Sequence, residues 1–156
     1  MSSDWLTPPE ILKALGPFGL DPATTCTMAH DGRPWRTARA CYCKCMDGLR
    51  EPWLDRVWLN PPYERPLTER FVQRLAEHGN GIALVMARTE SAWFQNWVLN
   101  QATGILFLRK RPHFYTETGE RMKDRATTAS VLVAYGEKNL DALHASKLDG
   151  KILMCA

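Results

Sequence analysis

The stretch Val57-Trp-Leu-Asn-Pro-Pro-Tyr63 carries the strongest pattern in the sequence. Its first three residues are apolar, as in a short buried strand. Two consecutive prolines then end that strand, because they fix the backbone and remove two hydrogen-bond donors. In an open parallel sheet, ligands bind beyond the carboxyl ends of the strands. The motif from Asn60 to Tyr63 therefore predicts a binding site directly after a strand.

The sequence after this motif alternates between helical and strand patterns. Because helices separate most of the strands, we expect an α/β fold with right-handed crossovers and a mainly parallel sheet. The strands on either side of the long segment 109–129 have no helix between them and are expected to form a C-terminal antiparallel hairpin. In chain order, the patterns predict a helix at 67–78, a strand at 81–86, a helix at 93–98, strands at 105–108 and 130–134, a helix at 140–145 and a strand at 152–154.

The sequence before the motif predicts one helix and one short strand. Thr7 is expected to be the N-cap of a helix whose first residue is Pro8 and which ends at Gly16. Residues 18–20 are expected to form a strand that ends in a turn at 21–23. The residues from 24 to 50 lack periodicity and are expected to be mostly irregular.

The composition is ordinary for a globular protein, with 45% hydrophobic and 24% charged residues, and 156 residues fit a single domain over 1–156. No apolar run reaches the length of a membrane span, and no secretory signal is visible at the start of the sequence. We therefore expect a cytoplasmic protein that does not associate with membranes. A net charge of +3 permits a polyanionic partner without requiring one.

The residue types of the motif match the chemistry of methylating an exocyclic amine. Such an amine is a poor nucleophile, because its lone pair is conjugated into the ring. The side-chain oxygen of Asn60 and the carbonyl of Pro61 could accept its two N–H bonds and direct the lone pair at a methyl donor, without a metal or a covalent nucleophile. Tyr63, after Pro62, would stack on an extruded base. The alternative is a structural turn with Tyr63 as an ordinary half-buried aromatic.

Further motifs extend across most of the chain. Together with the strand and motif at 57–63, they make the sequence resemble the phage-type DNA N6-adenine methyltransferases, a compact Dam-like family. That resemblance implies a minimal Rossmann-like fold that uses S-adenosylmethionine. The motifs that carry it are Trp5-Leu-Thr-Pro8, Leu20-Asp-Pro-Ala23, Asp47-Gly-Leu49, Ala87-Arg-Thr89 with Trp93-Phe94, residues 111–114, and Ser130-Val-Leu-Val133.

The resemblance also implies which residues bind the cofactor. Thr7 and Pro8 would line its pocket near the methionine moiety, and Asp21, followed by Pro22, would pair with its ammonium group. Asp47 would lie near its adenine ring. The usual Gly-x-Gly loop of methyltransferases is absent after residue 20.

A basic segment is the candidate DNA contact. Arg109, Lys110 and Arg111 open a stretch that interleaves basic and aromatic residues up to residue 125, a composition that suits double-stranded DNA. By the resemblance, Phe114 would form the second wall of the base slot, and Arg88 could reach the same rim. The alternative is a solvated loop. The chain is too short for a separate target-recognition domain, so specificity would come from loops or from a partner subunit, and the oligomeric state stays open.

The cysteines provide a second candidate site. Cys41, Cys43 and Cys45, with Cys26 and His30 upstream, supply enough soft ligands for zinc. Their spacing is not that of a Cys-x-x-Cys knuckle, and amine methylation needs no zinc. We therefore expect reduced thiols and no metal.

These observations favour a DNA adenine N6-methyltransferase, either site-specific or loosely specific, that acts on a flipped adenine. One alternative is an amino-methyltransferase acting on RNA or on protein glutamine, since those enzymes share Asn-Pro-Pro-Tyr. Another is a non-enzymatic DNA-binding protein with a degenerate methyltransferase fold, which the missing Gly-x-Gly would favour.

Overall fold

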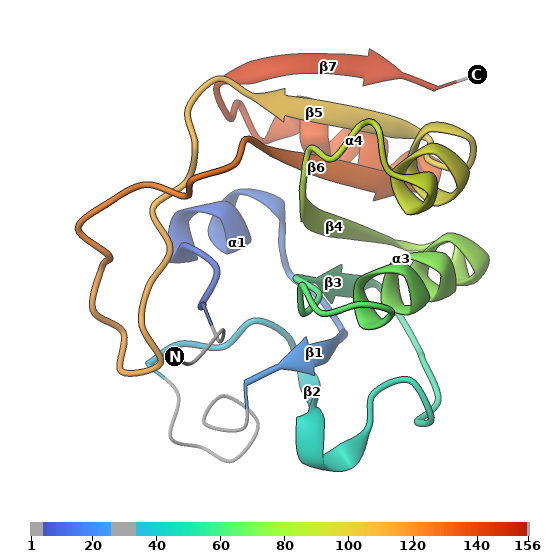
Figure 1. Ribbon diagram of the computed structural model, residues 1–156. Helices are drawn as coiled ribbons and strands as arrows, with labels where there is room; N and C mark the ends of the chain where they lie inside the picture. Colours follow the sequence, from blue (N-terminus) through green and yellow to red (C-terminus); the bar gives the residue numbers. More distant parts are fainter. Residues whose placement is uncertain (1–4, 26–33, 156) are drawn as a thin grey trace.

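The computed structural model describes residues 5–25 and 34–155, which form one seven-stranded sheet with helices on both faces (Figure 1). The strand order is β2-β1-β3-β4-β6-β5-β7. The strands are β1 (Leu20–Thr24), β2 (Ala40–Cys43), β3 (Val57–Leu59), β4 (Gly81–Met86), β5 (Gly104–Leu108), β6 (Ser130–Tyr135) and β7 (Gly150–Met154). The helices are α1 (Pro9–Leu15), α3 (Leu67–His78) and α4 (Glu137–Ala145), with a 3-10 helix η1 (Lys44–Met46) and a π-helix η2 (Phe94–Leu99).

The sheet is parallel on one side of β4 and antiparallel on the other. Strands β1 to β4 pair in parallel, which agrees with the expected parallel sheet in that half. Strand β6 pairs antiparallel with both β4 and β5, and β7 pairs antiparallel with β5. The predicted hairpin between the strands flanking residues 109–129 is therefore confirmed, and β7 adds an edge strand to it.

Two helical layers cover the sheet because successive side chains of a strand point to opposite faces. On one face, Val57 and Leu59 of β3 join a core with Phe71 of α3 and Phe94 of η2. On the other face, Trp58 joins a core with residues of α1 and α4. Central strands buried on both faces explain the continuous apolar runs in the sequence.

Helix α1 begins one residue later than expected. Its N-cap is Pro8, no side chain caps it, and Gly16 ends it as predicted. The expectation that Thr7 caps this helix is wrong, because the Thr7 hydroxyl lies instead within 3.5 Å of the side-chain nitrogen of Asn60. The segment before α1 is therefore bound to the end of β3 rather than to its own helix.

Residues 20–50 hold more regular structure than their composition predicts. Strand β1 continues through Pro22, where the expected turn was wrong, and the register between β1 and β2 shifts between Asp21 and Thr24. A proline fits there because an irregular register leaves its missing N–H without a required partner. Strand β2 lies within the span expected to be irregular, at the edge of the sheet.

No helix among the described residues combines the length and the apolar character that a membrane span requires.

Candidate active site

A cavity of about 540 Å³ lies at the edge of the sheet where β1 and β3 end. Between these two neighbouring strands the connections change direction, since the chain passes from β1 outward to β2 and then back across to β3. Such a switch point leaves a crevice beyond the carboxyl ends of the strands. Figure 1 shows the segment between β5 and β6 and the coloured segment that leads into α1 at this same edge.

Asn60 is held by the N-terminal segment. Its side-chain nitrogen donates to the carbonyl of Trp5 at 3.3 Å and approaches the hydroxyl of Thr7 at 3.5 Å. Within residues 5–25 and 34–155, no group donates to its side-chain oxygen, nor to the carbonyl of Pro61. Both residues line the cavity. Each of these two consecutive residues in the cavity wall therefore keeps an oxygen acceptor that no described donor uses.

The rest of the motif is fixed by α3 and β4. The hydroxyl of Thr68 in α3 donates to the carbonyl of Pro62 at 2.6 Å. The Tyr63 hydroxyl donates to the carbonyl of Leu84 at 3.3 Å and accepts from the backbone N–H of Met86 at 3.2 Å. Because β3 ends at Leu59, these backbone groups of β4 have no strand partner on that side.

Tyr63 combines an enclosed hydroxyl with an accessible ring. Burial raises the pKa of its hydroxyl, and the hydrogen bond from Met86 lowers it in part. The side chain is nevertheless 38% exposed and lines the cavity. The ring is thus anchored at its tip and open along its side, which suits a planar ligand.

Asp21 is a buried carboxylate in the cavity wall, only 3% exposed. Burial raises its pKa from 3.8 to about 6, and hydrogen bonds from Thr37, Ala23 and Thr24 partly offset that rise. The Thr37 hydroxyl donates at 2.6 Å. No described residue forms an ion pair with Asp21. A cationic ligand would therefore find an uncompensated carboxylate here.

The loop after η1 forms the next part of the wall. Asp47 has a positive φ of 52°, its side chain accepts from the N–H of Leu49 at 3.3 Å, and it pairs with Arg50 at 3.2 Å. A Cβ on Gly48 would lie 1.9 Å from the carbonyl oxygen of Pro22. Only glycine allows the loop to approach β1 this closely.

The segment between β5 and β6 forms a further part of the cavity wall. Leu6 and Tyr115 exchange backbone hydrogen bonds at 2.8 and 3.1 Å, which joins this segment to the N-terminal residues that hold Asn60. Trp35 packs edge-on against Tyr115 at 5.1 Å between ring centroids. Phe114 and Arg125 of the segment line the cavity.

The structure brings most of the predicted site residues together. Those that line the cavity are Thr7, Asp21, Pro22, Asp47, Asn60, Pro61, Pro62, Tyr63 and Phe114. Pro8 is buried at the start of α1, and Arg88, Arg109, Lys110 and Arg111 are exposed; none of these five lines the cavity.

The basic residues at this edge differ in their partners. Arg109 pairs with Asp149 at 3.0 Å, and Arg111 donates to the carbonyl of Thr127 at 3.0 Å. Lys110 has no side-chain hydrogen bond or ion pair among the described residues. It is the most available of the three for an external anion.

Sequence reasoning did not mention Thr37 or Arg74, and it quoted Gly48 within the motif Asp47-Gly-Leu49 without giving it a role. Thr37 binds Asp21 across sixteen positions of the chain. Gly48 packs against the backbone of Pro22, and Arg74 donates to backbone carbonyls. Arg74 lies outside the apolar face of α3, so the sequence pattern predicts only a polar surface residue there. No local pattern identifies any of them, because each partner comes from a distant part of the sequence.

The cysteine group does not form a metal site among the described residues, where no three His, Cys, Asp or Glu side chains gather around a common point. Cys43 and Cys45 form a disulfide, so the expectation of reduced thiols is wrong for this pair. Cys26 and His30 lie outside the described residues.

Comparison with known families gives a match over nearly the whole chain. The family described as DNA N-6-adenine-methyltransferase (Dam) matches residues 2–146. No curated protein and no solved structure matches the chain.

Proposed function

The chain belongs to the DNA N-6-adenine-methyltransferase (Dam) family, and from that premise we propose that it methylates N6 of an adenine flipped out of double-stranded DNA, with S-adenosylmethionine as the methyl donor. The observation that carries the proposal is the pair of free acceptors, the side-chain oxygen of Asn60 and the carbonyl of Pro61, in the wall of a cavity that also holds a buried carboxylate.

The residues present suit S-adenosylmethionine. The cavity volume lies within the range of about 300–1,000 Å³ that small-molecule sites occupy. Asp21 would bind the ammonium group, since its buried charge lacks a cationic partner among the described residues. Thr7, Pro22 and Asp47 would surround the rest, with Pro8 behind them at the start of α1. When bound, this cofactor supplies an electrophilic methyl group on a positively charged sulfur.

Asn60 and Pro61 would orient the amine for attack. By accepting its two N–H bonds, they draw the nitrogen towards tetrahedral geometry and direct its lone pair at the methyl carbon. The nitrogen–carbon bond forms as the carbon–sulfur bond breaks, and the electron pair stays with sulfur. The two oxygens stabilise the positive charge that develops on nitrogen, and the surplus proton leaves to solvent.

Tyr63 and Phe114 would hold the base. An amino group inside a duplex is out of reach, so the target nucleotide must leave the stack. The anchored ring of Tyr63 offers one wall of a slot, and Phe114, from the segment between β5 and β6, offers the other.

The DNA itself would lie against the carboxyl edge of the sheet. Arg88 follows β4 there, and Arg109, Lys110 and Arg111 follow β5; all four are exposed. Phosphate contacts from such residues position a duplex without reading its sequence.

The proposed architecture is a single domain over residues 1–156 with a Rossmann-like arrangement. Its support is the crevice at the switch point between β1 and β3, where such folds bind their cofactor. Asp21 within β1 and Asn60 directly after β3 then line one cavity from adjacent strands.

Methyl transfer is tested with labelled S-adenosylmethionine and unmethylated duplex DNA, followed by mass spectrometry of the nucleosides. Single-stranded DNA, RNA and a glutamine-containing protein extract are run in parallel. We expect N6-methyldeoxyadenosine from the duplex. Label that appears only in RNA or protein would contradict the DNA substrate, and no cofactor binding at all would contradict the enzyme itself.

A further inference from the structure

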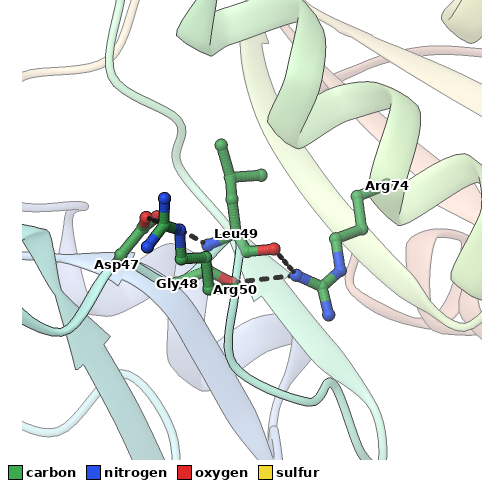
Figure 2. Close-up of polar contacts among 5 residues, drawn as sticks. All are labelled: Asp47, Gly48, Leu49, Arg50 and Arg74. Carbon is green, nitrogen blue, oxygen red and sulfur yellow. Dashed lines mark hydrogen bonds and ion pairs between the residues drawn. The ribbon is translucent and has the colours of Figure 1, made fainter.

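The side chain of Arg74 extends from α3 to the loop that follows η1 and lines the cavity. Its guanidinium donates to the carbonyls of Gly48, at 3.3 Å, of Leu49, and of Glu51, at 2.6 Å. Figure 2 shows the guanidinium pointing at the loop, with the contacts to Gly48 and Leu49 drawn. One side chain therefore fixes three peptide groups of one short loop.

Trp53 contacts both Arg74 and the loop. The guanidinium of Arg74 lies 4.9 Å from the centre of the Trp53 ring, and the Trp53 indole N–H donates to the carbonyl of Gly48 at 2.7 Å. The Gly48 carbonyl thus accepts from two donors on the α3 side. Within the part of the chain that the structure describes, no carboxylate pairs with Arg74, so its charge is balanced by peptide dipoles and an aromatic face.

The opposite side of the loop touches β1. Gly48 abuts the carbonyl of Pro22 so closely that a Cβ would not fit. The loop is therefore held between α3 on one side and Pro22 of β1 on the other. Asp47, Gly48 and Leu49 line the cavity from this position, next to Asp21.

We propose that Arg74 is a positioning residue for the cofactor: it fixes the loop Asp47–Leu49 as a wall of the cofactor site. This inference rests on the proposed function. A lysine cannot replace the arginine, because a single ammonium group lacks the planar fork that reaches several carbonyls while stacking on an indole.

The test compares Arg74→Ala and Arg74→Lys with Arg70→Ala, a control on the same helix whose exposed side chain has no hydrogen bond or ion pair with any described residue of the loop. The full chain is titrated with S-adenosylmethionine and separately with duplex DNA, and kcat is measured at saturating cofactor. We expect both Arg74 variants to raise the Kd and the KM for cofactor at least tenfold. The Kd for DNA and kcat should change less than threefold, and Arg70→Ala should match the wild type.

Three outcomes would overturn the inference. Unchanged cofactor affinity in folded Arg74→Lys, with an active wild type, would remove the role of Arg74 and leave the proposed function intact. A parallel loss of cofactor and DNA affinity, together with a lower Tm, would mean that Arg74 only stabilises the fold. A wild type that binds no cofactor would overturn the proposed function and this inference together.

Discussion

Asn60 and Pro61 present two oxygens that no other group in the described chain uses. The side-chain nitrogen of Asn60 is engaged by Trp5 and Thr7, which fixes the orientation of the amide. An isolated motif could not have indicated this, because the partners lie more than fifty positions earlier in the sequence. The sequence predicted the acceptors from their chemistry, and the structure adds what orients them.

The raised pKa of Asp21 predicts that the affinity for the cofactor depends on pH. Burial raises its pKa from 3.8 to about 6, and only the ionised form attracts an ammonium group. The Kd for S-adenosylmethionine should therefore fall about tenfold per pH unit as pH rises towards 6, and should level off above it. Calorimetric titrations from pH 5 to 7.5 measure this. Asp21→Asn should bind weakly and show little pH dependence, and a flat wild-type profile would contradict the role of Asp21.

The same carboxylate should limit stability. Because its pKa is higher in the folded state than the unfolded value of 3.8, its contribution to stability is fully present below pH 3.8 and is lost as pH rises through 6. A shift of about two pKa units corresponds to about 3 kcal/mol, and losing one hydrogen bond in the variant costs about 1 kcal/mol. Asp21→Asn should thus raise the free energy of unfolding at pH 7 by about 2 kcal/mol in denaturant titrations. A loss of stability in that variant would contradict the uncompensated charge.

Tyr63 is expected to act through its ring more than through its hydroxyl. Tyr63→Ala removes the stacking face and should weaken binding of a duplex with a mismatched target adenine by at least tenfold, since stacking contributes about 1–3 kcal/mol per base. Tyr63→Phe keeps the ring and should lose less than Tyr63→Ala. Fluorescence titrations with a 2-aminopurine target measure both. Equal losses in the two variants would show that the ring is not the binding element.

At the scale of elements, α3 and β4 match their predicted bounds, because each has a strong apolar pattern and a glycine at its boundary. Strand β2 was missed. Its residues are mostly exposed or half-buried, and its formation depends on pairing with β1. Local sequence cannot reveal an edge strand whose stability comes from its neighbour.

Helix α3 contacts both the loop 47–51 and the motif Asn60–Tyr63. Arg74 binds the loop 47–51, and Thr68 donates to the carbonyl of Pro62 in the motif Asn60–Tyr63 at 2.6 Å. Thr68→Val should remove that hydrogen bond and loosen the motif, with kcat falling about tenfold and cofactor Kd unchanged. Thr68→Ser keeps the hydroxyl and serves as the control. Steady-state kinetics with an unchanged kcat in Thr68→Val would show that the motif holds its shape without α3.

At the scale of the whole molecule, the site forms because chain segments that are far apart in the sequence meet at one edge of the sheet. The segment before α1 joins the segment between β5 and β6 through the bridge between Leu6 and Tyr115. Both segments line the same cavity as Asn60, which follows β3. The resemblance implied that Phe114 of the basic segment reaches the site, and Phe114 does line the cavity. The sequence could not predict the bridge, which pairs residues 6 and 115.

DNA binding should depend on this edge. Lys110→Ala removes an exposed charge that has no ion-pair partner among the described residues, so DNA affinity should fall and the slope of log Kd against log salt concentration should decrease by about one. Lys138→Ala, at the start of α4 near Gly16 and Arg56, removes an equal charge elsewhere and serves as the control. Salt titrations of duplex binding measure both slopes. Equal effects of the two variants would mean that no particular surface binds DNA.

The most direct test is single-turnover methyl transfer to an unmethylated duplex by the wild type and by Asn60→Ala, with cofactor Kd measured for both. Removing one of the two acceptors should lower the transfer rate at least a hundredfold while cofactor Kd and Tm stay near their wild-type values. Transfer by Asn60→Ala at the wild-type rate would contradict the assignment of Asn60 and Pro61 as the groups that orient the amine.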